Sequence, residues 1–265
     1  MAQKKKSPLK DRPLRYAGQS LDERIDNLFD DQILPYFMLS VFMVATAVME
    51  WFRFFRNPKP SPLTISALAL VVVLFTIYKV RKNIKKIKAI KQGRDGERAV
   101  GQYLEMLREN GHRIFHDILG DNFNIDHVII SRKGVFVVET KTYSKPEKGR
   151  AEIHFNGKKL SMDSVGVQTG PITQVSASSK WLADVLLETT GKRFPVKPVI
   201  LFPGWYVKTD SEGKKSSDIW VLNPKALPSF IENSPDVISQ EDMMLASFHT
   251  SRYIRTKEAV RFKEG

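Results

Sequence analysis

Two carboxylates and one lysine are spaced so that they could share a site at the end of a strand pair. Asp126 lies in an isoleucine- and valine-rich run at 124–130. A second such run, at 135–141, ends on Glu139, a threonine and Lys141. Runs of this length and composition predict strands that are covered on both faces.

The register of this predicted hairpin decides whether the charged side chains meet. A tight turn at 131–134 pairs Ile130 with Val135 and places Asp126 directly opposite Glu139. Directly opposed residues have Cβ atoms about 5 Å apart. The lysine two positions after Glu139 is on the same face because side chains alternate along a strand. A bulge in the turn would shift the pairing by one residue.

Two carboxylates this close repel each other unless a cation or a proton lies between them. Mg²⁺ takes oxygen ligands from one or two carboxylates, together with water and substrate phosphate. Such an ion can orient and deprotonate a water that attacks a phosphodiester. We therefore expect Asp126 and Glu139 to bind Mg²⁺ or Mn²⁺, with Lys141 positioning the water or neutralising developing charge. The alternative is a structural ion pair of Glu139 and Lys141 beside a surface Asp126.

A third carboxylate is predicted at the start of a helix. Apolar residues recur with helical spacing from 100 to 107, Asp95 is the expected N-cap, and Gly111 closes the helix. Glu97 falls three residues before Val100, on the same face as the apolar stripe. It could stabilise the helix N-terminus, or it could point into a site between helix and sheet. Both interpretations stay open.

The fuller pattern resembles a known family. Its three strings are Gly-Glu-Arg-Ala-Val at 96–100, Asn-Ile-Asp-His-Val-Ile-Ile-Ser at 124–131 and Gly-Val-Phe-Val-Val-Glu-Thr-Lys at 134–141. Asp126 followed by Glu139 and Lys141 resembles the PD-(D/E)XK nuclease signature. Together the strings resemble the nuclease-related domain (NERD) family over about 93–205. The resemblance implies an α/β fold with a mixed central sheet flanked by helices. It also implies a metal-dependent phosphodiesterase site in which Glu97 is an extra acidic residue.

The resemblance further implies a downstream helix that carries a glutamine. Pro171 at a first-turn position, with apolar residues at 175, 182, 185 and 186, predicts such a helix. Gln174 could hydrogen-bond the attacking water or a phosphate oxygen, or it could be an ordinary first-turn polar residue. The expected metal ligands are therefore Asp126, Glu139 and Glu97, and the expected catalytic residues also include Lys141 and Gln174.

Two uncharged hydrophobic segments precede this region. Residues 33–49 and 62–78 contain no Asp, Glu, Lys or Arg. With their flanks they predict transmembrane helices at about 33–52 and 62–80, because a span needs ~17–25 residues. The Asn-Pro-Lys-Pro sequence at 57–60 would reverse the chain into a hairpin. A pair of buried core helices is the alternative, and it is disfavoured because neither segment has a polar stripe.

The chain is basic, with 42 Lys and Arg against 29 Asp and Glu and a net charge of +13. Such a charge favours polyanionic partners, either nucleic acid or an anionic membrane surface. Basic residues flank both outer ends of the predicted hairpin, which places both termini in the cytoplasm of a bacterium with a multi-pass anchor in its inner membrane. The basic stretch at 79–91 is expected to lie on anionic lipid, with nucleic-acid binding as its alternative.

The chain has no cysteine, so a disulfide, a thiolate metal site and a cysteine nucleophile are excluded. His127 is expected to face away from Asp126. The expected organisation is a basic and polar N-terminal arm at 1–32, a transmembrane hairpin at 33–80, a basic juxtamembrane helix at 81–94, a NERD-like nuclease domain at 95–205 and a strand-and-helix extension of that domain at 206–265.

These patterns predict a membrane-anchored, metal-dependent nuclease that hydrolyses phosphodiester bonds of DNA or RNA. The alternative is a catalytically silent NERD-fold module that binds nucleic acid or a protein partner at the membrane.

Overall fold

The valine- and isoleucine-rich strands form the centre of the fold. In the computed structural model, β2 (Asn124–Ser131) and β3 (Gly134–Thr140) are antiparallel neighbours in a five-stranded sheet of order β1-β2-β3-β7-β9. The other strands are β1 (Arg113–Leu119), β7 (Val196–Leu201) and β9 (Trp220–Leu222). β1 is antiparallel to β2, whereas β3, β7 and β9 are parallel to one another. The sheet is therefore mixed, as expected.

The structure describes residues 13–57, 61–147, 149–211, 213 and 217–264. These residues form two compact units: residues 13–19 pack together with the chain from Gly93 onward, and Ser20–Gln92 form the second unit. We call the first the sheet unit and the second the hairpin unit, and each is described by itself.

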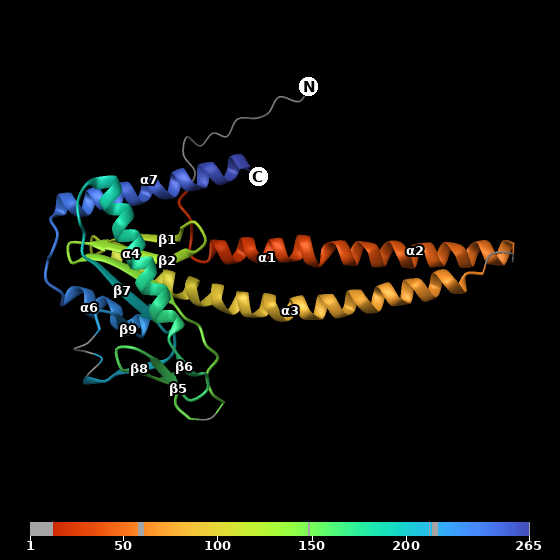
Figure 1. Cartoon of the computed structure of the whole chain (residues 1–265), viewed down its shortest axis with the longest axis horizontal. Coiled ribbons are helices and arrows are strands. Elements are labelled where there is room, and N and C mark those ends of the chain that lie inside the picture. Colours follow the sequence, from red (N-terminus) through yellow and green to blue (C-terminus); the bar gives the residue numbers. More distant parts are fainter. Residues whose placement is uncertain (1–12, 58–60, 148, 212, 214–216, 265) are drawn as a thin grey trace, which may run out of the picture. The chain divides into compact units, whose positions relative to one another are not determined.

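Helices cover both faces of the five-stranded sheet (Figure 1). On one face, α4 (Gly170–Thr190) and α7 (Gln240–Glu264) contribute to the larger apolar core, in which Leu182 and Ala246 pack with Val137. On the other face lie the end of α3 (Leu63–Glu105), η1 (Met106–Arg108) and α6 (Leu227–Glu232). There Leu104 and Leu227 pack with residues such as Phe136. The fold is mixed α/β.

A second, smaller sheet belongs to the same unit. Its order is β6-β5-β4-β8, and its strands are β4 (Glu152–Phe155), β5 (Leu160–Met162), β6 (Gly166–Gln168) and β8 (Tyr206–Thr209). Ile153, Phe155 and Leu160 are fully buried in the larger apolar core. The short η2 helix (Pro224–Ala226) follows β9.

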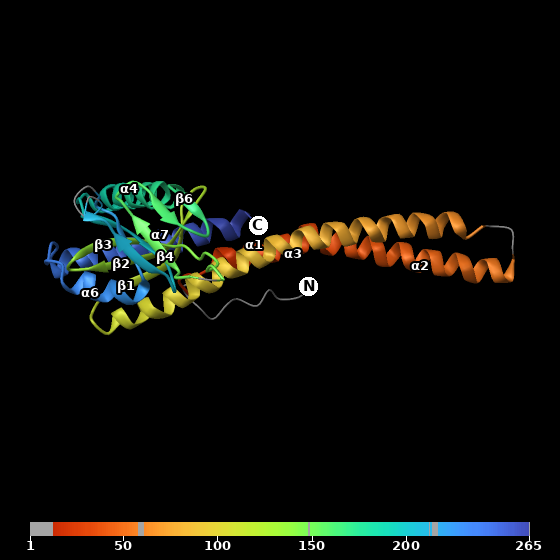
Figure 2. The ribbon, with the colours of Figure 1, turned by 90° about the horizontal axis from the view of Figure 1, so that it is seen from below.

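The hairpin unit contains α1 (Gln19–Gln32), α2 (Leu34–Arg56) and the part of α3 before residue 93. α2 and α3 run side by side in opposite directions (Figure 2), since Ser40 donates to Thr76 at 2.7 Å and Trp51 donates to Ser66 at 3.0 Å. The stretches Gln19–Arg56 and Leu63–Arg108 are long and apolar enough to cross a membrane, which weakly suggests membrane association.

The predicted helix start at Asp95 is wrong. α3 is helical from Leu63 to Glu105, so Asp95 lies inside it and caps nothing. The glycines were interpreted as a boundary, but an interior glycine costs a helix only about 1 kcal/mol. Gly96 has a different role, because a Cβ at this position would overlap the hydroxyl of Thr142. It lets α3 approach the chain that leaves β3.

Candidate functional site

The β2–β3 hairpin has the register that the sequence predicts. Ile130 pairs with Val135 and His127 pairs with Val138, so the next step along the strands sets Asp126 opposite Glu139. The two-residue turn ends at a glycine with φ of 119°, a conformation open to glycine, and it introduces no bulge.

The hairpin brings the expected acid and base groups together in a nearly closed environment. Asp126 and Glu139 are 4% and 3% exposed. One oxygen of Asp126 accepts a hydrogen bond of 2.7 Å from the backbone N–H of Thr140. Lys141 Nζ lies 2.6 Å from Glu139 Oε1. The alternative interpretation required Asp126 at the surface, and this is excluded. The ion pair of Glu139 and Lys141 in that interpretation is present.

Gln174 joins this group from the first turns of α4. Its Oε1 accepts a hydrogen bond of 2.9 Å from Lys141 Nζ. Pro171 lies at the start of the same helix, as the sequence predicts. The backbone N–H of Lys141 donates to Leu201 at 2.9 Å, which continues the β3–β7 pairing past the end of β3. The lysine is thus held at both its backbone and its side chain.

Glu97 comes from α3 and faces the same group. Burial, followed by repulsion from Asp117 and Glu139, raises the pKa of Glu97 to about 8, while Lys141 opposes the shift. Glu97 is 7% exposed, and its Oε2 is buried without a hydrogen bond to the described part of the chain. A helix-capping carboxylate would be solvated or bonded to backbone N–H groups. Glu97 instead fits the interpretation in which it points into a site.

Burial is the largest cause of the raised pKa values of all three carboxylates, and the positive charge of Lys141 opposes each shift. Burial raises the pKa of Asp126 well above its usual range, and the charges of Glu139 and Glu97 add to this. Burial also raises the pKa of Glu139, against the lowering effects of Lys141 and Gln174. Burial alone would lower the pKa of Lys141, but the attraction of Glu139 raises it overall. A bound cation would remove this repulsion.

The donor set fits a hard divalent cation in part. Carboxylate oxygens are the ligands that Mg²⁺ prefers, and the buried Oε2 of Glu97 is available. Among the residues that the structure describes, however, no three His, Asp or Glu side chains form a preformed metal centre. One or two carboxylates with water and phosphate completing the shell is the usual Mg²⁺ arrangement. The three-ligand set stays a prediction.

Two buried charged residues, Asp117 near Glu97 and its partner Arg15, were not expected from the sequence. Asp117 on β1 is fully buried and has φ of 50°, which is rare for a residue other than glycine. Arg15 donates to it through Nε at 2.9 Å and Nη2 at 2.7 Å, and Arg15 also pairs with Glu258 of α7. No local signal marks this triad, because 102 residues separate Arg15 from Asp117.

His127 lies on the face of the sheet away from Asp126, as expected. Its Nδ1 is 2.8 Å from His116 Nδ1, and His116 Nε2 is 2.7 Å from Glu105 of α3. Burial, followed by the charge of His116, lowers the pKa of His127 well below its usual range. These histidines belong to the packing between α3 and the sheet.

The mixed sheet with flanking helices, with Asp126, Glu139 and Lys141 together at a hairpin end, is the arrangement that the sequence resemblance implies. Comparison with family models agrees, since residues 92–203 match the nuclease-related domain, NERD. This match confirms the resemblance inferred from the sequence motifs.

Two similar proteins place this match in context. An uncharacterised protein of Bacillus anthracis is 36% identical over 85 residues, which are 30% of this chain and 38% of that protein. The chain therefore spans well under half of that relative. Pyrococcus furiosus SfsA in complex with Ca²⁺ is similar over 49% of this chain and 54% of its own, with 18% identity and a TM-score of 0.27. That score is too low to carry an argument.

Proposed function

We propose that this protein is a membrane-anchored, metal-dependent nuclease that hydrolyses phosphodiester bonds of DNA or RNA. One observation carries the proposal: Asp126 and Glu139 are buried side by side, with Lys141 in contact and an unbonded Glu97 oxygen nearby. Buried carboxylates with raised pKa values, of which one is paired with a lysine, are costly to a fold. Such groups cluster at functional sites.

Each residue has a separate role in this proposal. Asp126, Glu139 and Glu97 would bind Mg²⁺ or Mn²⁺, which supplies positive charge to the scissile phosphate and makes a water more acidic. Lys141 stabilises negative charge that develops on the phosphate oxygens. Gln174 holds Lys141 in place and can exchange that hydrogen bond for one to the attacking water.

The second candidate function is a catalytically silent module that binds nucleic acid or a protein partner at the membrane. The contact of 2.6 Å between Lys141 and Glu139 favours it, because the lysine already neutralises one carboxylate. In the described part of the chain, Asp126 and Glu97 form no ion pair, and the charge of Lys141 offsets only part of the effects that raise their pKa values. We therefore prefer the nuclease.

The membrane part of the proposal rests on exposed apolar side chains of the hairpin unit. Phe42, Phe52 and Leu70 are 66%, 69% and 60% exposed. Apolar surface of this extent is typical of a membrane or protein interface. We infer a multi-pass anchor in the bacterial inner membrane with both ends in the cytoplasm and residues 79–91 on anionic lipid. If the full chain floated free of membranes after cell lysis and washing, the anchor would be wrong.

Cleavage by the full chain in detergent tests the enzymatic part. Supercoiled plasmid, linear duplex, single-stranded DNA and RNA would each be incubated with Mg²⁺, with Mn²⁺ and with EDTA. We expect cutting that needs a divalent ion and that falls at least a hundredfold in Glu139→Gln and in Lys141→Ala. Binding without cutting in every condition would leave the silent module.

A further inference from the structure

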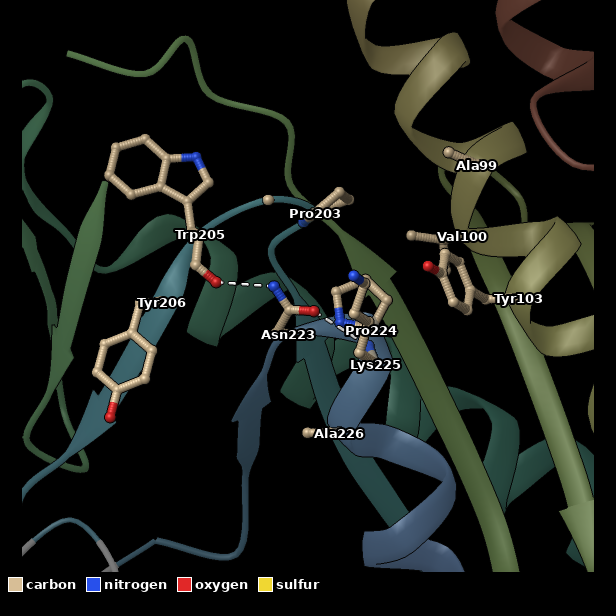
Figure 3. A pocket seen from close by; sticks show the side chains of 11 residues that line it. Ala99, Val100, Tyr103, Pro203, Trp205, Tyr206, Asn223, Pro224, Lys225 and Ala226 are labelled. Carbon is tan, nitrogen blue, oxygen red and sulfur yellow. Dashed lines mark hydrogen bonds between the residues drawn. The ribbon is translucent and has the colours of Figure 1, made fainter. Parts of the chain in front are cut away.

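Figure 3 shows a pocket of about 680 Å³ that is lined by residues following β7 and β9, at the edge of the sheet where β3 also ends. Because β3, β7 and β9 are parallel, their carboxyl ends meet at this edge, where they are followed by Lys141, Phe202 and Asn223. The pocket is lined by residues that follow β7 and β9 and by the turn of α3 that comes after Glu97. Neighbouring strands lie about 4.8 Å apart. The pocket therefore begins one or two strands away from Lys141 across the sheet.

Aromatic rings form two sides of this pocket. Figure 3 shows Tyr103 of α3 on one side and Tyr206 of β8 on the other. Their exposed fractions are 37% and 63%, and Lys208 Nζ lies 6.0 Å from the centre of the Tyr206 ring. Pro203 and Pro224 add apolar surface between them. Flat exposed rings of this kind bind flat partners by stacking.

The floor of the pocket is held in place by hydrogen bonds. Asn223 Nδ2 donates to the carbonyl of Trp205 at 2.8 Å, and Asn223 Oδ1 accepts from the backbone N–H of Lys225 at 3.0 Å. The Trp205 indole is 2% exposed and donates to the carbonyl of Tyr143 at 3.3 Å. The pocket is therefore preformed, as ligand sites usually are.

The charge around the pocket is positive. Lys225 lines it, and no acidic side chain does so in the part of the chain that the structure describes. The side chain of Lys145 lies across the Gly204 turn, so that a Cβ on this glycine would be 2.9 Å from the ammonium group. Lys145 thus lies beside Gly204, which is one of the residues that line the pocket. Aromatic rings together with lysines are typical of surfaces that bind single-stranded nucleic acid.

We propose that this pocket is a base-binding subsite for single-stranded nucleic acid. A base stacks on Tyr103 or Tyr206, while the flanking phosphates contact Lys225 and Lys145 on the way to the carboxylate site. A base-paired strand cannot present a free base face to the pocket without unpairing. The choice of nucleic acid as ligand rests on the proposed nuclease function, but the binding itself does not require cleavage.

Binding of labelled oligonucleotides by the full chain in detergent tests this subsite. Fluorescence anisotropy with oligo-dT and oligo-U of about 12 nucleotides would be measured in EDTA, so that no cutting occurs. We expect Tyr103→Ala or Tyr206→Ala to weaken binding about tenfold or more, as the loss of one stacked base does. Tyr206→Phe keeps the ring and should bind like the parent. Phe248→Ala removes an exposed ring on α7, away from the pocket, and should also leave binding unchanged.

An abasic oligomer separates stacking from charge. It should bind weakly and equally to the parent and to both alanine variants. Parent-like binding of oligo-dT and oligo-U by both alanine variants, with unchanged thermal unfolding, would overturn the subsite even if the protein cuts nucleic acid. Tyrosine-dependent binding without any cutting in Mg²⁺ would instead support the subsite and contradict the proposed nuclease function. If the alanine variants lose affinity for only one of the two oligomers, the subsite also selects for the sugar or the base.

Discussion

At the residue scale, the lysine of the site is held by two partners before any substrate binds. Glu139 and Gln174 lie 2.6 and 2.9 Å from Lys141 Nζ. A lysine side chain is flexible. Fixing its ammonium group before substrate binds removes the entropy cost of ordering it during the reaction. The two contacts differ in kind, because Glu139 is also an expected metal ligand and Gln174 is not.

Gln174→Ala separates positioning from metal binding. Removing the amide deletes its hydrogen bonds to Lys141 and to Glu139. The loss of a hydrogen bond to a charged group costs about 1.5 kcal/mol at an exposed position, so we expect cleavage to slow about tenfold. The Mg²⁺ concentration for half-maximal rate should change much less than the rate. Thr173→Ala alters the neighbouring exposed residue of α4 and serves as the matched control. An unchanged rate in Gln174→Ala would mean that the contact is structural only.

Arg15 carries a prediction about stability. Arg15→Ala leaves Asp117 and Glu258 buried without their partner, and breaking a buried ion pair from one side costs about 3–5 kcal/mol. We expect a clearly lower unfolding midpoint. Adding Asp117→Asn to Arg15→Ala should restore part of the loss, because one of the two carboxylates that lost Arg15 is then uncharged.

The matched control for Arg15 is the solvent-exposed pair of Lys192 and Asp242. Lys192→Ala should change the unfolding midpoint very little, since exposed pairs contribute little. Equal effects of Arg15→Ala and Lys192→Ala would show that residues 13–19 do not pack against the sheet unit in solution.

The sequence was sufficient for one part of the site and insufficient for the other. The turn length and the alternation of apolar residues determine the hairpin register, so Asp126, Glu139 and Lys141 could be placed together. Arg15 and Asp117 could not be paired, because their contact depends on how distant segments pack. Arg15 also lies in a basic arm, where a positive charge is explained by the nearby membrane flank. The sequence therefore offers no reason to expect a buried Arg15.

At the element scale, α3 packs closely against its neighbours because it carries glycine at positions where a larger side chain would overlap them. A Cβ on Gly101 would lie 2.8 Å from the Cβ of Ala17, in the segment 13–19. Alanine is favoured over glycine in a helix by about 1 kcal/mol, so Gly101→Ala would stabilise an isolated α3. In the folded unit we expect Gly101→Ala to lower the unfolding midpoint, because two methyl groups would overlap.

The reciprocal exchange tests this contact. Ala17→Gly combined with Gly101→Ala moves the methyl group from one side of the contact to the other and should recover most of the lost stability. Thermal unfolding of the two single variants and the double variant gives the coupling directly. Additive effects without recovery would show that Ala17 does not touch α3.

The ends of the helices and strands were harder to predict than their presence. The strands at 124–131 and 134–140 follow from composition alone, and so does the apolar character of α2 and the first half of α3. The helix boundary at Asp95 was wrong because Gly93 and Gly96 have the same local signature as a helix break. Only the proximity of Thr142 shows why Gly96 is needed.

At the scale of the whole molecule, the sheet unit is assembled from two separated stretches of chain. Residues 13–19 pack with the chain from Gly93 onward, although residues 20–92 lie between them in sequence. Gly18 lies close to Arg94, with a Cβ position 3.6 Å from its Cα. A short linker could therefore join residue 19 to residue 93 directly.

We expect a chain in which a few Gly and Ser residues replace 20–92 to fold as a soluble, monodisperse domain. A chain that starts at residue 93 lacks Arg15 and Ala17 and should unfold at a markedly lower temperature or aggregate. Circular dichroism and size-exclusion chromatography would compare the two. Equal stability would contradict the role of residues 13–19, and failure of both chains would show that the hairpin unit is needed for folding.

The central claim is that the buried carboxylates form a metal site rather than a structural ion-pair cluster. Titrating the full chain with Mn²⁺ and counting the bound ion by electron paramagnetic resonance tests it most directly. We predict Mn²⁺ binding that Mg²⁺ competes away and that Asp126→Asn or Glu139→Gln abolishes, while Glu241→Gln at the start of α7 leaves it unchanged. No bound Mn²⁺ in the folded parent, or binding that survives both site substitutions, would contradict the account.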